Sequence, residues 1–115
     1  MQDPLTMSLL YDTYGALLTD KQAACFELYY HQDLSLTEIA EEEGISRQGV
    51  HDSIARAENA LRHFEQTLGN VQRDRQMQQA LQTITRAAQA LRQHSDPAVQ
   101  AMAETIFSAT ESIKE

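Results

Sequence analysis

The sequence DLSLTEIAEEEGISRQGVHDSIARAENAL, residues 33–61, contains the start and stop signals of two helices separated by a tight turn. Ser35 and Glu38 have the spacing of a capping box, so a short helix is expected to begin at about Leu36. Gly44 has no Cβ and can end this helix in the left-handed conformation. The pattern therefore predicts that the chain turns within a few residues of Gly44.

A second, longer helix is predicted after the turn, with Ile45 filling the corner and Ser46 as the N-cap. Its apolar residues recur at alternating steps of four and three, which places them on one helix face. They are Val50, Ile54, Ala57, Leu61, Phe64 and Leu68. A short helix, a turn containing Gly and a longer helix are typical of a helix-turn-helix, which presents side chains to a DNA major groove.

The second helix also carries polar side chains that lie off its apolar face and are candidates for contact with nucleic acid or a partner. They are Arg47, Gln48, His51, Asp52 and Arg56. Arg and Gln can form paired hydrogen bonds with base edges in the major groove. The alternative is an ordinary solvated face, since every amphipathic helix has one.

The charge of the chain does not favour duplex DNA. The net charge is −8, and residues 1–70 carry 12 acidic and 4 basic side chains, whereas residues 71–115 carry five of each. The acidic run Glu41–Glu43 lies beside the turn that would approach phosphates. Proteins that displace counterions from phosphates normally present clustered Lys and Arg. The acidic setting therefore fits a basic protein surface better.

Length and composition allow one domain and a short helical extension in 115 residues, of which 42% are hydrophobic. No charged start followed by an apolar stretch indicates a secretory signal or a membrane span, so we expect a cytoplasmic protein without membrane contact. Cys25 is the only cysteine and cannot form an internal disulfide. Its place in a helical pattern predicts a packed core thiol.

Two further helices are predicted before the helix-turn-helix. Asp3 and Pro4 begin a helix that ends near Tyr14, before Gly15. Thr19 and Gln22 form a second capping box, and the helix that follows has an aromatic-rich inner surface. That surface consists of Ala23, Phe26, Leu28, Tyr29 and Tyr30. Residues 1–68 are thus expected to form a domain of about four helices. We also expect this domain to be winged-helix-like.

Residues 69–115 are predicted to form a helical extension of about two helices. Gly69 and Asn70 break the register, and Ser95–Pro97 separates the two helices. The apolar stripe of the first is Met77, Leu81, Ile84, Ala88 and Leu91, and that of the second is Val99, Met102, Ala103, Ile106, Phe107 and Ile113. No segment is typical of a strand, so an all-α fold is predicted.

A helical pair of this length is not stable alone, so its apolar stripes must be buried against the first four helices or against another chain. Its narrow, Ala-rich seams favour self-association or docking on a partner over packing against the first four helices. Four arginines of the first extension helix are candidates for contact with RNA or an acidic protein, and an ordinary solvated face is the alternative. They are Arg73, Arg75, Arg86 and Arg92.

The sequence contains no pattern that indicates catalysis, a metal or a cofactor. No G-x-x-x-x-G-K-[ST], G-x-S-x-G or H-E-x-x-H motif occurs, and we interpret the four Gly residues as helix ends. The histidines lack a second ligand at a metal-binding spacing; they are His31, His51, His63 and His94. We therefore interpret the chain as a binding module and not as an enzyme.

The chain resembles the YlxM family of small bacterial helix-turn-helix proteins in four segments. They are Leu18–Gln22, Phe26–Tyr30, Asp33–Ala40 and Gly44–Asp52. The resemblance continues through Arg56–Glu58 and Leu61 to about Leu68, and beyond that it weakens to helical character. The same region is more distantly similar to region four of bacterial sigma factors, through the E-I-A, G-I-S-R and V pattern.

This resemblance implies a function that the residues alone do not. Members of the family are encoded beside the signal recognition particle GTPase and are considered accessory components or modulators of that particle, and they form dimers. The first hypothesis is thus a homodimeric accessory protein that binds this GTPase or the particle's RNA. The second is a DNA-binding regulator that uses Arg47, Gln48 and His51, and a third is a dimerisation adaptor.

Overall fold

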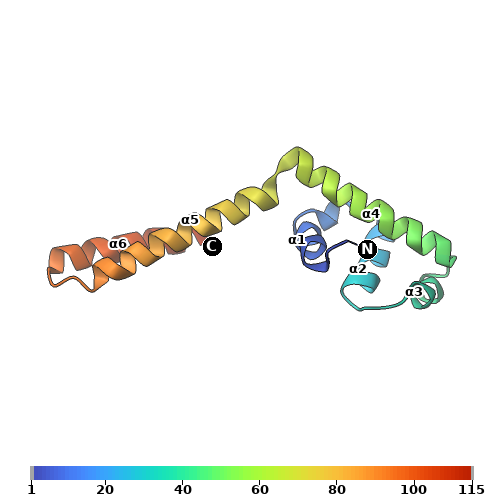
Figure 1. Ribbon diagram of the computed structural model, residues 1–115, viewed down its shortest axis with the longest axis horizontal. Helices are drawn as coiled ribbons and strands as arrows, with labels where there is room; N and C mark the ends of the chain where they lie inside the picture. Colours follow the sequence, from blue (N-terminus) through green and yellow to red (C-terminus); the bar gives the residue numbers. More distant parts are fainter. Residues whose placement is uncertain (1, 115) are drawn as a thin grey trace. The chain divides into compact units, whose positions relative to one another are not determined.

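The computed structural model describes residues 2–114, which form helices joined by short turns (Figure 1). In chain order they are α1 (Pro4–Tyr14), the short 3₁₀ helix η1 (Gly15–Leu17), α2 (Asp20–Tyr30), α3 (Leu36–Glu43), α4 (Arg47–Leu68), α5 (Asn70–Arg92) and α6 (Pro97–Lys114). These residues include no strand, which confirms the predicted all-α fold. The winged-helix-like description is wrong, because no strand is available there to form a wing.

The helices divide into two compact units, one that reaches to Val71 and one that begins at Gln72. From the sequence we placed the boundary after Leu68. The first unit extends further because Val71 packs against its core. No helix of the described residues is long and apolar enough to cross a membrane.

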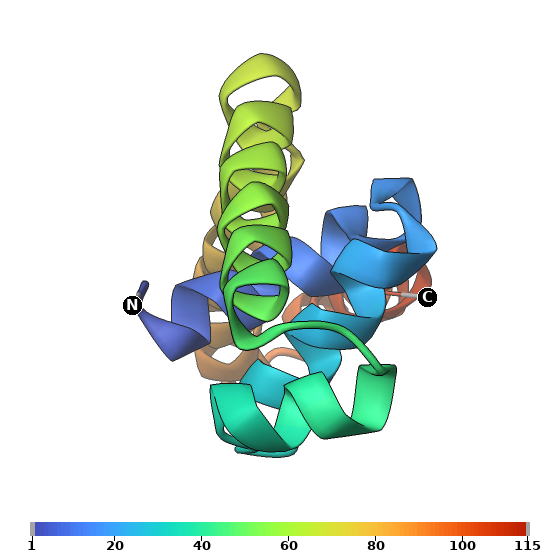
Figure 2. The same cartoon turned by 90° about the vertical axis from the view of Figure 1, so that its right-hand side faces the viewer.

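The core of the first unit has two parts, and α4 contributes to both, as Figure 2 shows where α4 crosses the other helices. One part joins α1, α2 and α4 through Met7, Leu10, Tyr14, Leu18, Phe26, Ala57 and Leu61. The other joins α2, α3 and α4 through Cys25, Ile39, Val50 and Ile54. The prediction of a packed Cys25 is confirmed, and burial raises the pKa of its thiol. Leu68 is 42% exposed, so its assignment to the buried face of α4 is wrong.

Side-chain caps begin the helices of this unit where the sequence predicts them. The boxes of Thr19 with Gln22 and of Ser35 with Glu38 are both complete, and Gly44 ends α3 with a φ of 68°. Gly49 corrects the view that every glycine ends a helix. It lies in the first turn of α4, where a Cβ would come within 3.1 Å of Ser46 Oγ.

Three tyrosine hydroxyls connect the helices of the first unit by donating to glutamates. Tyr11 in α1 donates to Glu27 in α2, and Tyr30 in α2 donates to Glu58 in α4. Burial, followed by the bond to Glu27, raises the pKa of Tyr11 to about 12, and burial next to Glu58 likewise raises the pKa of Tyr30. These hydroxyls therefore remain protonated donors at neutral pH.

The third of these hydroxyls belongs to Tyr14 and reaches the junction of α4 with α5. It donates to Glu65 at 2.6 Å and accepts a bond from the backbone N–H of Asn70 at 3.1 Å. The N–H of Val71 donates to the same oxygen of Glu65 at 3.1 Å. The chain around Gly69, where α4 ends, is thus held by a residue of α1.

The second unit is a hairpin of α5 and α6 with a thin buried seam (Figure 1). The seam consists of Leu81, Ala88, Ala103 and Thr110. Near the turn, Arg92 Nε donates to Glu104 at 2.8 Å and the guanidinium lies 4.1 Å from the centre of the Phe107 ring. Five large apolar side chains remain outside the seam, with exposed fractions of 51% (Met77), 44% (Ile84), 40% (Leu91), 63% (Met102) and 56% (Ile113). The hairpin therefore buries only part of the apolar stripes that the sequence predicts for its helices.

Candidate functional site

The helix-turn-helix of the first unit consists of α3, the turn after it and the beginning of α4 (Figure 2). Ile39, Val50 and Ile54 are completely buried and fix α3 against α4. Ile45 packs against this cluster, and its N–H donates to the carbonyl of Ala40 at 3.1 Å. The predicted turn, in which Gly44 ends α3 and Ser46 caps α4, is confirmed. The first turns of α4 have one face toward solvent.

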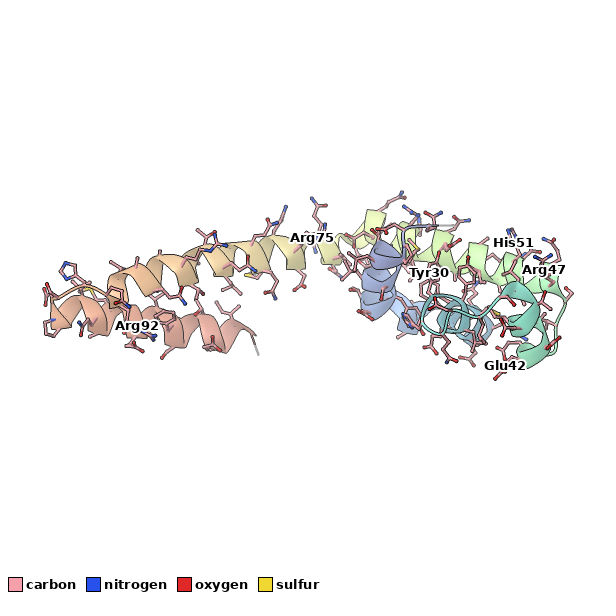
Figure 3. The ribbon with its side chains drawn as sticks, turned by 60° about the horizontal axis from the view of Figure 1, so that its bottom comes forward. Tyr30, Glu42, Arg47, His51, Arg75 and Arg92 are labelled. Atoms are coloured by element: carbon pink, nitrogen blue, oxygen red, sulfur yellow. The ribbon has the colours of Figure 1, made fainter. Side chains whose placement is uncertain are left out.

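The five candidate residues of α4 are all exposed; they are Arg47, Gln48, His51, Asp52 and Arg56. Figure 3 shows Arg47 and His51 close together at the start of α4. Asp52 accepts a hydrogen bond from Gln48 Nε2 at 3.0 Å and lies 3.6 Å from His51 Nδ1. Within residues 2–114, Arg47 forms no ion pair with a carboxylate. Its charge is therefore available to a ligand, whereas Gln48 is already held by a neighbour.

A surface hollow of about 380 Å³ lies between the two helices of the motif. It is lined by Leu36 from the start of α3 and by Arg47, Gln48 and His51 from α4. Its volume is at the small end of ligand pockets. The sequence did not identify Leu36 as part of a site, because that role depends on the angle at which α3 meets α4. The hollow combines an apolar wall with polar and cationic groups.

The surroundings of this hollow are acidic. Glu38, Glu41 and Glu42 are exposed on α3, and Figure 3 shows where Glu42 lies on this helix and Arg47 at the start of α4. Glu38 accepts a hydrogen bond from the backbone N–H of Ser35 in the cap of the helix, and its hydrogen bonds with the backbone and the side chain of Ser35 hold the pKa of its carboxyl below the usual range. Helix α3, which lines the hollow through Leu36, thus carries exposed acidic side chains along its length.

The four candidate arginines of α5 do not share one side of the helix. Arg92 turns toward α6, where it contacts Glu104 and Phe107. Arg73 also interacts with another group of the protein. Arg75 and Arg86 are separated by three helical turns, so they lie on a common face. Because Arg92 closes the hairpin, the four arginines do not form a single surface.

The described residues contain no group of three or more His, Cys, Asp or Glu side chains that could hold a metal ion. In the first unit, Glu27, Glu58 and Glu65 accept hydrogen bonds from tyrosine hydroxyls, and Glu38 caps a helix.

Comparison with known proteins identifies a family model and bacterial relatives to which the chain is similar. The model of the UPF0122 family, described as "Putative helix-turn-helix protein, YlxM / p13 like", matches residues 1–101. A UPF0122 protein of Thermoanaerobacter sp. (strain X514) is 48% identical over 105 residues, which cover 90% of each chain. A UPF0122 protein of Caldanaerobacter subterraneus subsp. tengcongensis is 52% identical over 82 residues, covering 71% of this chain and 70% of the relative. The similarity thus continues through α5, further than Leu68, where we expected it to weaken.

Proposed function

Since this chain belongs to the YlxM / p13-like family of helix-turn-helix proteins, we propose that it is an accessory protein of the bacterial signal recognition particle. Its partner in this proposal is the GTPase of the particle, and the particle's RNA is the other partner that the family resemblance implies. The observation that carries the proposal is the acidic α3 beside the exposed start of α4.

The charge around the helix-turn-helix supports a protein partner. Glu41 and Glu42 are exposed next to the turn that leads to Arg47. Carboxylates at this place repel the phosphates of a duplex, whereas a basic protein surface is attracted by them and is steered during association.

A homodimer is the second part of the proposal, and the exposed apolar residues of the α5–α6 hairpin support it. Met77, Ile84 and Leu91 are seven residues apart, which is the spacing of a coiled-coil seam. A second copy that packs the same face against them removes apolar surface which two helices alone leave in water. This contact also stabilises a hairpin that is marginal by itself.

A Glu42→Lys substitution is expected to weaken binding to the purified GTPase by about tenfold, because it replaces attraction to a basic surface by repulsion. Binding by titration calorimetry and GTP turnover with and without the chain are the measurements. Asp12→Lys is the matched control, since Asp12 is exposed on α1 and the change in charge is the same. An equal loss in both variants would assign the effect to net charge and not to α3.

A DNA-binding regulator is the alternative function, and the grouping of Arg47, Gln48 and His51 at the exposed start of α4 favours it. Arg47→Ala separates the two functions. It is expected to leave GTPase binding nearly unchanged, whereas a regulator that contacts bases through Arg47 would lose its operator. A gel shift with genomic fragments at ~50 mM salt, where phosphate contacts are strongest, is the measurement. A discrete shift that Arg47→Ala abolishes would contradict our proposal.

A further inference from the structure

A second hollow, of about 300 Å³, lies in the first unit between the start of α1 and the loop that follows α2. We call it the Tyr–Asp hollow, and it is lined by Gln2, Pro4, Tyr29, Tyr30, Asp33 and Leu34. It shares no lining residue with the hollow at the start of α4. Its volume is at the small end of ligand pockets. It therefore admits a small molecule or one long side chain, and not a helix.

The walls of the Tyr–Asp hollow are mostly aromatic or apolar, and the core holds them in place. The centre of the Tyr30 ring lies 4.5 Å from that of Phe26, and Tyr29 and Leu34 pack against the second part of the core. The loop is fixed as well, because the N–H of Leu34 donates to the carbonyl of Leu28 at 3.0 Å. The hollow is thus formed by the fold itself and does not require a ligand to order it.

Asp33 is the one charged side chain among the described residues that line this hollow. Within residues 2–114 its carboxylate forms neither an ion pair nor a hydrogen bond. Asp33 follows the end of α2, where the carbonyls of Tyr29 and Tyr30 accept no backbone hydrogen bond from the described part of the chain. Such a helix end carries a partial negative charge. The hollow therefore favours a cation.

A cationic side chain near the hollow, Arg62, is already engaged. Its Nη2 donates to the side-chain oxygen of Gln2. Glu58, which is 5% exposed, is four residues earlier on the same face of α4 and offsets the charge of Arg62. Glu58 also accepts the hydrogen bond of Tyr30. The carboxylate of Asp33 thus remains without a cation to compensate it.

The surroundings of Asp33 determine the class of cation. A calcium ion takes six to eight oxygen ligands, whereas the side chains here provide one carboxylate. An ammonium group is strongly hydrated, which disfavours a place among apolar walls. A guanidinium is planar and less hydrated, forms two parallel hydrogen bonds with a carboxylate and stacks on aromatic rings. Among residues 2–114, the Tyr29 ring contacts one other ring, that of Tyr30 at 5.1 Å between centres, so it has surface left for a ligand.

We propose that the Tyr–Asp hollow binds an alkylguanidinium group, which donates to the carboxylate of Asp33 and stacks on the ring of Tyr29. The group belongs either to free arginine or to an arginine side chain of a peptide, and the chemistry of recognition is the same for both. This site goes beyond the proposed function, which rests on α3 and the start of α4. Each of the two can fail while the other holds.

The test is a titration of the full, ¹⁵N-labelled chain with N-acetyl-L-argininamide, followed by the NMR shifts of its backbone amides. Saturable shifts are expected at Gln2 and in residues 29–34. The matched ligand is N-acetyl-L-citrullinamide, which has nearly the same shape without the charge and is expected to bind at least about tenfold more weakly, because hydrogen bonds to charged groups are the stronger ones. Equal binding of the two ligands, or no saturable shift in these residues, would overturn the proposal.

Free L-arginine distinguishes the two sources of the group. Tighter binding of L-arginine than of N-acetyl-L-argininamide would support the free amino acid as the ligand, because only the free form has its own ammonium and carboxylate. Equal or tighter binding of the capped form would support an arginine within a peptide. Binding by N-acetyl-L-lysinamide is expected to be weaker than by the arginine derivative. A preference for lysine would refute recognition of a guanidinium.

Asp33→Asn removes the charge with little change in shape, and Asn tolerates the left-handed φ of 55° at this position. It is expected to weaken binding of N-acetyl-L-argininamide by about tenfold. Asp12→Asn is the matched control, since Asp12 is exposed on α1 and loses the same charge. An equal loss in both variants would reduce the effect to net charge and contradict the proposal.

Tyr29→Leu tests the aromatic wall while keeping an apolar side chain. It is expected to weaken binding by about threefold or more, the usual size of a cation–π contact. The amide spectrum of each variant shows whether its fold is retained. Unchanged affinity in a folded Tyr29→Leu variant would refute stacking on this ring. Glu42→Lys, which is expected to lose the GTPase and keep N-acetyl-L-argininamide, separates a failure of this inference from a failure of the proposed function.

Discussion

An Ile84→Asp variant is expected to be monomeric at concentrations at which the unsubstituted chain is a dimer. Ile84 lies between Met77 and Leu91 in the exposed apolar row of α5. In the proposed dimer this row is covered by a second copy, so the new carboxylate would be buried without a partner. Such burial costs several kcal/mol, which corresponds to an increase of the dimer dissociation constant by about a hundredfold or more. Sedimentation equilibrium measures this constant directly.

Thr83→Asp is the matched control for the dimer. Thr83 is exposed and adjacent in sequence, but it lies about a quarter turn away from Ile84. The same carboxylate at this place is expected to remain in water and leave the dimer intact. A monomeric unsubstituted chain, or equal dissociation of the two variants, would refute the proposal that this face joins two copies.

The Phe26→Ala substitution is expected to lower the free energy of unfolding of the first unit by about 3–5 kcal/mol. Phe26 is completely buried, and its ring lies 4.7 Å from that of Tyr11 and 4.5 Å from that of Tyr30, measured between centres. Its removal leaves a cavity between α1 and α2 and loosens two tyrosines that bind glutamates. The loss is a large part of the 5–15 kcal/mol that stabilise a typical domain.

Urea unfolding followed by circular dichroism measures this effect. Leu17→Ala is the control, because Leu17 is apolar but 60% exposed and is expected to change stability by less than about 0.5 kcal/mol. Similar losses for Phe26→Ala and Leu17→Ala would contradict the assignment of Phe26 to the core.

The parts of the fold that the sequence predicted are those with short-range causes. The capping box of Ser35 with Glu38 and the left-handed Gly44 depend on residues within one or two helical turns, and the structure contains both. Leu68 has the correct spacing for the buried face of α4, yet it is exposed. Spacing places a residue on a face, but it does not determine how far the neighbouring helices extend along that face.

The features that the sequence did not predict join residues far apart in the chain. The bonds of Tyr11 with Glu27 and of Tyr30 with Glu58 depend on how helices pack, and no local pattern indicates them. The same is true of Arg92, whose helical position does not reveal that Glu104 and Phe107 meet it across the hairpin. In the candidate site, the exposed residues of α4 were identified from their spacing alone, whereas Leu36 required the angle between two helices.

The hydroxyl of Tyr14 has a consequence for local unfolding. It holds Glu65 before the end of α4 and the N–H of Asn70 after it, so the amides that follow Gly69 are protected by a side chain from the first helix. Hydrogen bonds of this kind are broken when either element opens. Helix α1 and the beginning of α5 therefore belong to one cooperative unit of opening and closing, although more than fifty residues separate Tyr14 from Asn70 in the chain.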